Sequence, residues 1–506
     1  MKSGLRRIAL AVASAAGFGA LCAPSYAANW LMLQGTEPAS SSARAYLWGF
    51  IQAQYQKDNS DANPYLGTPG NNYKYVPAEL IGPNLTSQSA FNVNRARIGV
   101  RGTGFPLDST INYFLLAEFG NNALNATNSA AATLTDASIT VNRIPHARIR
   151  VGTFKYPTAE EAFQGIATFD YINFTEVTNQ MLLERFPNRT ATLNRNNVAG
   201  FNFADDGSTS PYNRFDRGVD GFRDTGIQIF DAFKTGNWEH SYAVMYGNGN
   251  GVNFSDNDSN KDTYLYWSSE KLFGGSGPFR QGLKFFVWHQ KGKRTLYNPA
   301  TPFPAGPGAD KEPAGKTEYD RMREGLGVAF RRGQFRATAE YMKGKGMIFL
   351  GPDNPSFTIT APCLAAVPPA QGGTYNPANG VPTCGTDTPQ NRALLADGRK
   401  GESNGWYVEG GWYIPNSDWE LDARYDVYKR LTNATKLDGP CAFEFDFKTT
   451  TLGAQYHFNK KTRLTMNAAA RKFEAVDCPA PAPGGNPNNN LDGVDKRYSI
   501  QLTHVF

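Results

Sequence analysis

The chain has few of the residues that carry most enzyme chemistry, with five cysteines and five histidines in 506 residues. The motifs His-Glu-x-x-His, Gly-x-Ser-x-Gly and Cys-x-x-Cys-His are absent, which leaves no signature of a zinc protease, a serine hydrolase or haem attachment. Residues 256–262 space their oxygen side chains like a calcium loop, but Lys261 stands where such a loop needs glycine. We therefore predict no cofactor and no enzymatic activity, with an enzyme site at the rim of a barrel as the alternative.

Strong net charge is also missing. The formal charge is +6, and it falls to +3 without residues 1–27, because these contain three basic residues and no acidic one. A charge this small does not indicate a nucleic-acid partner. The basic residues precede an apolar run at 8–21, and Ser25-Tyr26-Ala27 forms a small-x-small cleavage site. We predict a signal peptide over residues 1–27.

Long apolar runs are absent after residue 27, because none approaches the roughly 20 residues that a membrane helix needs. A secreted chain of this kind is either soluble or a β-barrel. In the last nine residues, 498–506, large apolar residues alternate with polar ones and the chain ends on Phe506, which is typical of the closing strand of an outer-membrane barrel. A final strand of a soluble sandwich is the alternative. An aromatic content of 13% at a mean hydropathy of −0.47 favours the barrel.

Alternating segments separated by turn residues continue through the chain. We predict an all-β, 16-stranded antiparallel transmembrane β-barrel over residues 44–506, preceded by a periplasmic lead-in at 28–43 and surrounded by the lipid of a bacterial outer membrane. The predicted strands are 44–56, 91–103, 109–119, 133–142, 146–154, 222–234, 237–246, 262–271, 280–290, 320–331, 334–345, 404–414, 419–431, 443–458, 462–474 and 495–506.

The connectors between these segments alternate between short and long. Such barrels have short periplasmic turns and longer outer loops, so both ends of the barrel are predicted on the periplasmic side. Around residues 449–451 the apolar positions change face, which predicts a β-bulge there.

The polar half of each strand points into a barrel, and here that half is rich in arginine. Guanidinium groups stay charged and match phosphate or carboxylate oxygens. The alternative is that these arginines pair with acidic residues across the lumen, for which Glu118, Asp136, Glu340, Asp422, Asp426, Glu444 and Asp446 are available. Acidic residues gather on the thirteenth and fourteenth strands, which suggests a transverse field with one basic and one acidic wall. The predicted pore-lining residues are Arg95, Arg97, Arg101, Arg148, Arg150, Arg321, Arg323, Arg336, Arg424, Arg463 and Arg471.

The longest connector, residues 155–221, follows the fifth strand. A loop of this length in a compact domain usually has a function. We predict that it folds into the lumen and narrows the pore, with a short helix near 158–164; an outward surface flap is the alternative. The predicted constriction residues are Tyr171, Arg185, Arg189 and Arg195.

Four cysteines remain after residue 27, in a compartment that permits disulfides. Cys363 and Cys384 fall in one predicted outer loop, and Cys441 and Cys478 fall in two loops that neighbour each other on the rim. We predict the disulfides Cys363–Cys384 and Cys441–Cys478, although four cysteines allow three pairings.

Three stretches resemble the phosphate-selective porin O and P family: residues 94–102 (NRARIGVRG), 148–157 (RIRVGTFKYP) and 222–228 (FRDTGIQ). The resemblance implies a homotrimer of sixteen-stranded channels in which basic side chains lead anions to a constriction formed by an inward loop. The chain departs from the family where an acidic-basic pair is expected, because residues 171–175 read YINFT. The outer loops also lack a dense group of lysines.

We therefore expect passive diffusion of small anionic solutes, phosphate-like or other, through an arginine-lined pore. A general or weakly selective porin is one alternative. A barrel whose outer loops bind a partner is another.

Overall fold

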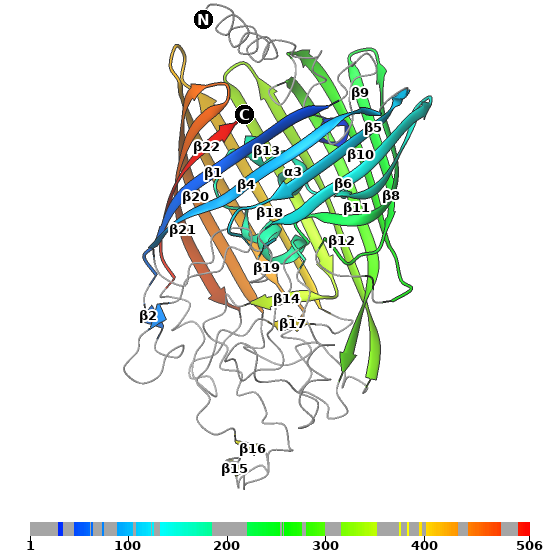
Figure 1. The fold of residues 1–506 in the computed structure, drawn as a ribbon. Helices are drawn as coiled ribbons and strands as arrows, with labels where there is room; N and C mark the ends of the chain where they lie inside the picture. The colour runs from blue at the N-terminus through cyan, green and yellow to red at the C-terminus, as the bar shows by residue number, and fades with distance from the viewer. Residues whose placement is uncertain are drawn as a thin grey trace, which may run out of the picture.

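The strands of this chain close into a ring. In the computed structural model, sixteen antiparallel strands form a closed barrel in which the first strand pairs with the last (Figure 1). Closure leaves the sheet without a free edge, which is the condition for placing β-structure in lipid. In chain order the barrel strands are β1 (Tyr46–Asp58), β4 (Ser89–Gly104), β5 (Asp108–Glu118), β6 (Thr133–Ile144), β7 (Ala147–Lys155), β8 (Arg223–Thr235), β9 (Trp238–Gly247), β10 (Asp262–Gly274), β11 (Gln281–Asn298), β12 (Gly315–Arg332), β13 (Phe335–Lys345), β18 (Glu402–Tyr413), β19 (Trp419–Arg430), β20 (Phe445–Asn459), β21 (Thr462–Ala475) and β22 (Arg497–Val505).

Shorter elements accompany the barrel. The structure describes residues 29–33, 45–60, 62–63, 73–74, 89–104, 108–122, 124–125, 132–184, 220–252, 256, 258–275, 280–298, 315–351, 374–375, 382–383, 394–396, 401–433, 444–476 and 494–506. Within them the helices are α2 (Trp30–Leu33), α3 (Glu160–Phe163), the 3-10 helix η3 (Ile166–Thr168) and the π-helix η4 (Val177–Leu182), and the remaining strands are β2 (Ala62–Asn63), β3 (Tyr73–Lys74), β14 (Ile348–Gly351), β15 (Thr374–Tyr375), β16 (Pro382–Thr383) and β17 (Leu394–Ala396). No helix in these ranges has the length and apolar character needed to cross a bilayer.

The predicted strand count and order are confirmed, since each of the sixteen segments overlaps one barrel strand. The largest differences are β11 and β12, which run well past the predicted ends at residues 290 and 320. These extensions pair with each other from Arg294 and Tyr319 out to Asn298 and Gly315. Polar residues there hid the strand pattern, because the alternation that marks a strand exists only where one face meets lipid.

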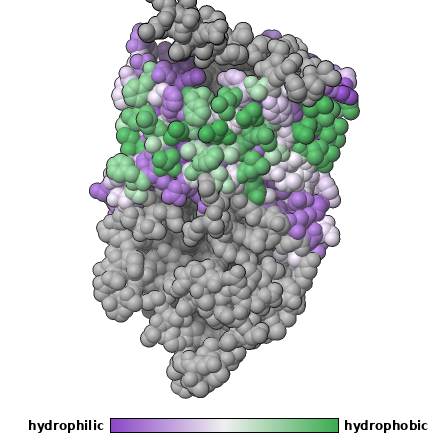
Figure 2. Space-filling model, in the orientation of Figure 1, coloured by the Kyte–Doolittle hydropathy of each residue, from purple (hydrophilic) through white to green (hydrophobic). Residues whose placement is uncertain are grey.

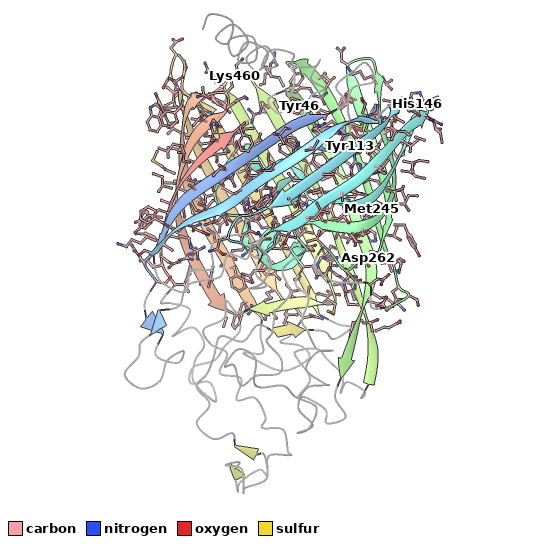
Figure 3. The ribbon with its side chains drawn as sticks, in the orientation of Figure 1. Tyr46, Tyr113, His146, Met245, Asp262 and Lys460 are labelled. Carbon is pink, nitrogen blue, oxygen red and sulfur yellow. The ribbon has the colours of Figure 1, made fainter. Side chains whose placement is uncertain are left out.

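The ends of the barrel are distinguished by their connections. His146 and Lys460 lie in short turns at the end where the carboxyl terminus is also found, whereas Asp262 begins β10 toward the opposite end (Figures 1 and 3). Tight turns require special backbone geometry, and Gly236 and Gly333 supply positive φ angles of 59° and 57° in two of them. The alternation of short and long connectors is as predicted.

The outer surface carries an apolar belt (Figure 2). It is built from the outward half of each strand, and examples are Leu326, Leu452 and Val151, which are 60%, 61% and 52% exposed. A closed barrel with this belt is a protein of the bacterial outer membrane.

The seam between the first and last strands is closed by the chain's final residue. Phe506 and Gly49 exchange two backbone hydrogen bonds, of 3.0 and 3.3 Å. A Cβ on residue 49 would lie 2.4 Å from the Phe506 ring and 2.4 Å from the Arg97 carbonyl oxygen. Glycine is therefore needed at this position for the aromatic ring to lie over the strand.

The predicted bulge at residues 449–451 is wrong. β20 pairs with β21 without a register shift from Phe445 to His457, and the irregularity comes only after that point. Phe445 and Phe447 lie on the inner face together with Thr449 and Thr451, and all four are buried. The facing therefore never changes; aromatic residues simply occupy lumenal positions.

Candidate functional site

The loop between β7 and β8, residues 156–222 and here called the inner loop, lies inside the barrel over its described residues, 156–184 and 220–222. It contacts the wall on several sides: Gln52 of β1 donates to the Ile166 carbonyl at 3.2 Å, and Asn467 of β21 accepts from the Ile172 backbone at 2.8 Å. On other strands Arg323 donates to the Met181 carbonyl at 2.8 Å. The short helix predicted near 158–164 is present as α3.

Glu161 holds the two arms of the inner loop together. Its carboxylate accepts hydrogen bonds from the backbone and the hydroxyl of Thr175 at 2.9 and 2.5 Å. Arg424 of β19 donates to it at 3.0 Å. The Arg424 guanidinium also lies 4.3 Å from the centre of the Tyr171 ring. Tyr171, a predicted constriction residue, is therefore buried between the loop and the wall.

The base of the inner loop is fastened at Asp220. Its carboxylate accepts from the Tyr156 hydroxyl and from the backbones of Glu184 and Phe222 at 3.1 and 3.2 Å. The Asp220 backbone donates in return to the Glu184 carbonyl at 3.0 Å. Burial, reinforced by the nearby charge of Glu184, raises the pKa of Asp220 to about 7.

A pH dependence of loop closure follows from this pKa. If the part of the inner loop held by Asp220 opens, the Asp220 carboxyl returns to an ordinary pKa of about 3.9. A group whose pKa is raised in the closed state favours closure most at low pH, and that contribution is lost as the pH rises to about 7. We expect more frequent opening fluctuations in single-channel recordings at pH 8 than at pH 5. Asp220→Asn keeps the side-chain shape and should flatten this profile; an unchanged profile in the variant would assign the effect to another group.

Most of the predicted pore-lining arginines are paired with carboxylates on the inner face. Arg97 binds Glu118 at 2.7 Å, and Arg471 binds Asp58 at 2.7 Å. Such pairs hold charge in place and are weak evidence for a solute site. The other pairs are Arg148 with Asp231, Arg321 with Glu184, Arg336 with Asp170, Glu420 and Asp422, Arg424 with Glu161 and Asp426, and Arg463 with Asp170.

The remaining predicted arginines make other contacts. Arg95 is 2% exposed and donates to Gln52 at 2.9 Å, and Arg323 donates to backbone carbonyls, including that of Met347 at 2.9 Å. Arg150 lies over the Phe230 ring at 4.3 Å and donates to Thr140 at 3.3 Å. Arg101 donates to the Leu33 carbonyl at 3.2 Å.

Two of the acids considered as lumenal partners behave differently from expectation. Asp446 faces outward and lies 3.6 Å from Lys429, whose side chain is half exposed. Glu340 is buried in the lumen but accepts from Trp288, Tyr407 and the Glu160 backbone at 2.7, 2.8 and 3.1 Å. The inward register of Phe445 and Phe447 explains the first case, because it turns residue 446 to the outside.

Charge is unevenly distributed around the lumen. Along β4 to β8 the charges are nearly balanced: the buried bases are Arg95, Arg97, Arg150, Lys155 and Arg223, and the buried acids are Glu118, Asp136, Asp224 and Asp231. Along β13, β18 and β19 and on the inner loop, acids outnumber bases. The acids there are Glu340, Glu409, Glu420, Asp422, Asp426, Glu160, Glu161, Asp170, Glu176 and Asp220, and the bases are Arg336, Arg424 and Arg430.

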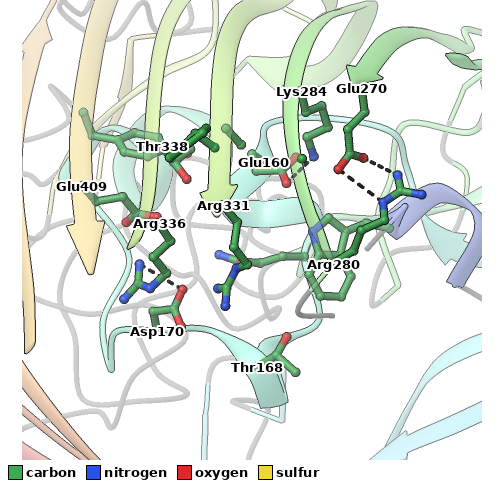
Figure 4. Close-up of a pocket in the computed structure, with 16 residues that line it drawn as sticks. Glu160, Thr168, Asp170, Glu270, Arg280, Lys284, Arg331, Arg336, Thr338 and Glu409 are labelled. Carbon is green, nitrogen blue, oxygen red and sulfur yellow. Dashed lines mark hydrogen bonds and ion pairs between the residues drawn. The ribbon is translucent and has the colours of Figure 1, made fainter. Parts of the chain in front are cut away.

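Two pockets lie between the inner loop and the wall. The first, here called the arginine pocket, encloses about 20 Å³ and is lined by Arg424, Asp426, Thr449, Thr451, Arg471 and Arg497, together with loop residues 173, 174 and 176. The second, here called the glutamate pocket, encloses about 90 Å³ and is lined by Glu160, Arg280, Lys284, Arg331, Arg336 and Glu409 among others (Figure 4).

The arginine pocket contains polar atoms that no described residue satisfies. They are Nε of Arg424, Nη1 of Arg471 and the hydroxyls of Thr449 and Thr451, with one acceptor, Oδ1 of Asp426. That oxygen lies 3.9 Å from Nε of Arg424, too far for a hydrogen bond. The pocket therefore presents mainly donors. The sequence pattern missed the two threonines because the expected bulge placed them at a change of face.

Several predicted features fall outside the described residues. These are the signal peptide at 1–27, the constriction residues Arg185, Arg189 and Arg195, and the cysteines Cys363, Cys384, Cys441 and Cys478. The disulfides and the roles of these arginines stay predictions.

A scan against models of protein families finds no match, and a search of curated proteins finds no relative. Among solved structures, the fold is similar to an anion-selective porin from Comamonas acidovorans, with 12% identity, a TM-score of 0.48, and coverage of 91% of this chain and 99% of that one. The outer membrane channel DcaP of Acinetobacter baumannii gives 12% identity, a TM-score of 0.44 and coverages of 92% and 99%. OmpF of Salmonella typhi, in complex with daunomycin, gives 11% identity, a TM-score of 0.42, and coverage of 91% of this chain and 97% of that one. At these identities we argue function from the residues of this chain.

Proposed function

We propose that this protein is an outer-membrane porin through which small anionic solutes, phosphate-like ions among them, diffuse passively. The observation that carries the proposal is the arginine pocket. One nitrogen of each of two guanidinium groups and two hydroxyls there offer donors for which no described residue supplies an acceptor, and the side chains of Arg424 and Arg471 are at least nine-tenths buried. Donors held in a low-dielectric site can replace part of an anion's hydration shell.

The uneven charge of the lumen supports the same direction of selectivity. An anion that passes the inner loop is repelled from the acidic side, formed by β13, β18 and β19, toward β4 to β8, where the buried charges are nearly balanced. Because Arg97 and Arg223 are paired with carboxylates and the other three cations are held by neutral groups, they attract an anion weakly enough to release it, which conduction requires. The resemblance in the three sequence stretches further suggests that three copies assemble as a homotrimer.

Reversal potentials in a planar bilayer under a potassium chloride gradient test this proposal. The wild-type channel is expected to be anion-selective. The double variant Thr449→Val, Thr451→Val keeps the side-chain volume and removes two donors from the arginine pocket. Each hydroxyl hydrogen bond contributes about 1 kcal/mol, roughly a fivefold factor, so we expect the anion-to-cation permeability ratio to fall several-fold.

Thr450→Val is the matched control, because Thr450 lies between the two pocket threonines in the sequence and is exposed on the outer face. It should leave selectivity unchanged. A reversal potential of cation-selective sign in the wild type would overturn the proposal. A potential near zero would instead favour a general porin. The nearly equal numbers of buried acidic and basic side chains among the described residues support that alternative.

A further inference from the structure

The glutamate pocket differs from the arginine pocket in the polar atoms that it leaves unsatisfied. It lies between the inner loop and strands β10 to β18, with Glu160 on the loop and Glu409 on the β18 wall (Figure 4). Within the described residues that line it, the buried polar atoms without a hydrogen-bond partner are Oε2 of Glu160 and Oε2 of Glu409. Both are acceptors. The pocket therefore lacks a donor where the arginine pocket lacks an acceptor.

Glu409 is the stronger of the two observations. It is 7% exposed, and its Oε2 is buried without a hydrogen-bond partner among the described residues. The nearest positive charges are those of Arg336 and Arg424, but each is held elsewhere: Arg336 by Asp170, Glu420 and Asp422, and Arg424 by Glu161. A buried carboxylate without a direct donor is costly.

The bases that line the pocket are likewise engaged. Lys284 is paired with Oε1 of Glu160, and Arg280 is paired with Glu239 and Glu270. Arg331 donates to the Tyr413 hydroxyl at 3.5 Å and lies over its ring at 5.9 Å. None of these cations has a donor that is both buried and unsatisfied. The unmet requirement of the pocket is thus for positive charge with several hydrogen-bond donors.

A metal ion fits this requirement poorly, because the described residues contain no group of three or more side chains arranged to hold one. A primary ammonium group fits better, since it is compact and carries three donors. The pocket's volume of about 90 Å³ admits a small organic solute, and Trp30 and Tyr407 supply aromatic surface beside the carboxylates. We propose that the glutamate pocket binds the ammonium group of a small amine-bearing solute, with Glu409 and Oε2 of Glu160 as its acceptors.

The test is equilibrium binding to the full-length protein in detergent micelles, by saturation-transfer NMR with propylammonium as the probe. This readout requires no conduction, so it can fail or succeed independently of the porin proposal. We expect propylammonium to bind and 1-propanol, its neutral analogue, to give no signal. Glu409→Gln removes the charge without breaking a hydrogen bond seen in the structure, and it should weaken binding about tenfold.

The matched control is Glu324→Gln, because Glu324 is a half-exposed carboxylate of β12 whose contact is His289 at 3.3 Å. It should bind propylammonium like the wild type, and both variants should show the folded barrel's heat-sensitive migration on gels. A parallel titration with β-alanine separates two sources of the ammonium group: tighter binding of β-alanine indicates a zwitterionic solute, and tighter binding of propylammonium indicates a simple amine. Absence of binding by both probes, or equal binding to wild type and Glu409→Gln, overturns the proposal.

Discussion

Replacing Glu161 with glutamine should give a channel with larger and noisier single-channel current. The wild-type carboxylate binds Thr175 and Arg424 at once, and so fixes both arms of the inner loop to β19. Glutamine loses the charge that holds Arg424. Hydrogen bonds to charged groups contribute about 1.5–3 kcal/mol, so the ratio of open to closed loop should rise roughly 10- to 100-fold. Planar-bilayer recordings at fixed voltage would measure the conductance and its fluctuations.

Thr175→Val separates loop release from loss of charge. Valine keeps the shape of Thr175 but cannot donate to Oε2 of Glu161, and Arg424 keeps its partner. Both variants should therefore raise conductance, with the smaller rise in Thr175→Val. If neither variant changes the conductance, the inner loop does not set the width of the pore.

Replacing Asp58 with asparagine should cause the largest loss of stability. Asp58 of β1 is fully buried and accepts from Arg471 of β21 and Arg497 of β22 at 2.7 and 3.1 Å. It thus joins the three strands at which the barrel closes. Without its charge, two neighbouring guanidinium groups remain buried together, and removal of one partner of a buried ion pair costs about 3–5 kcal/mol. Urea unfolding of the lipid-inserted protein, followed by heat-sensitive gel migration, would measure this cost.

Asp446→Asn is the corresponding control on the outer face. Its partner Lys429 is half exposed and lies 3.6 Å away, and exposed ion pairs contribute at most about 1 kcal/mol. The unfolding midpoint of this variant should stay close to that of the wild type. A similarly small effect of Asp58→Asn would mean that Arg471 and Arg497 find other acceptors.

The strands could be predicted from the sequence because lipid imposes one rule on every one of them: apolar residues outside and polar residues inside. That rule gave the count, the order and the position of the inner loop. It failed where lipid is absent. β11 and β12 extend past the apolar belt without alternation. The aromatic residues Phe445 and Phe447 face inward, where Phe447 packs with Phe445, Tyr428 and Phe473.

The roles of the lumenal charges could not be predicted from the strand pattern. The alternation of inward and outward residues along a strand shows that Arg336 and Arg424 point inward. It does not show that Asp170 and Glu161 of the inner loop reach them across the lumen. Those contacts join residues more than 160 positions apart in the chain. The unpaired carboxylate of Glu409 is hidden for the same reason, since a sequence shows which charges are present and not which of them meet.

Residues 29–33 have a practical consequence for watching this channel at work. Asn29 donates to Glu239 and Ser241 of β9 at 3.1 and 2.6 Å, and Trp30 lines the glutamate pocket. This short segment therefore lies inside the mouth of the barrel at the end of the short turns. The chain has eight tryptophans, so the difference in emission between the wild type and Trp30→Phe isolates the indole at that position, and this difference should change when a solute enters the pocket beside it. A fluorescence titration could then follow occupancy of the mouth without any label.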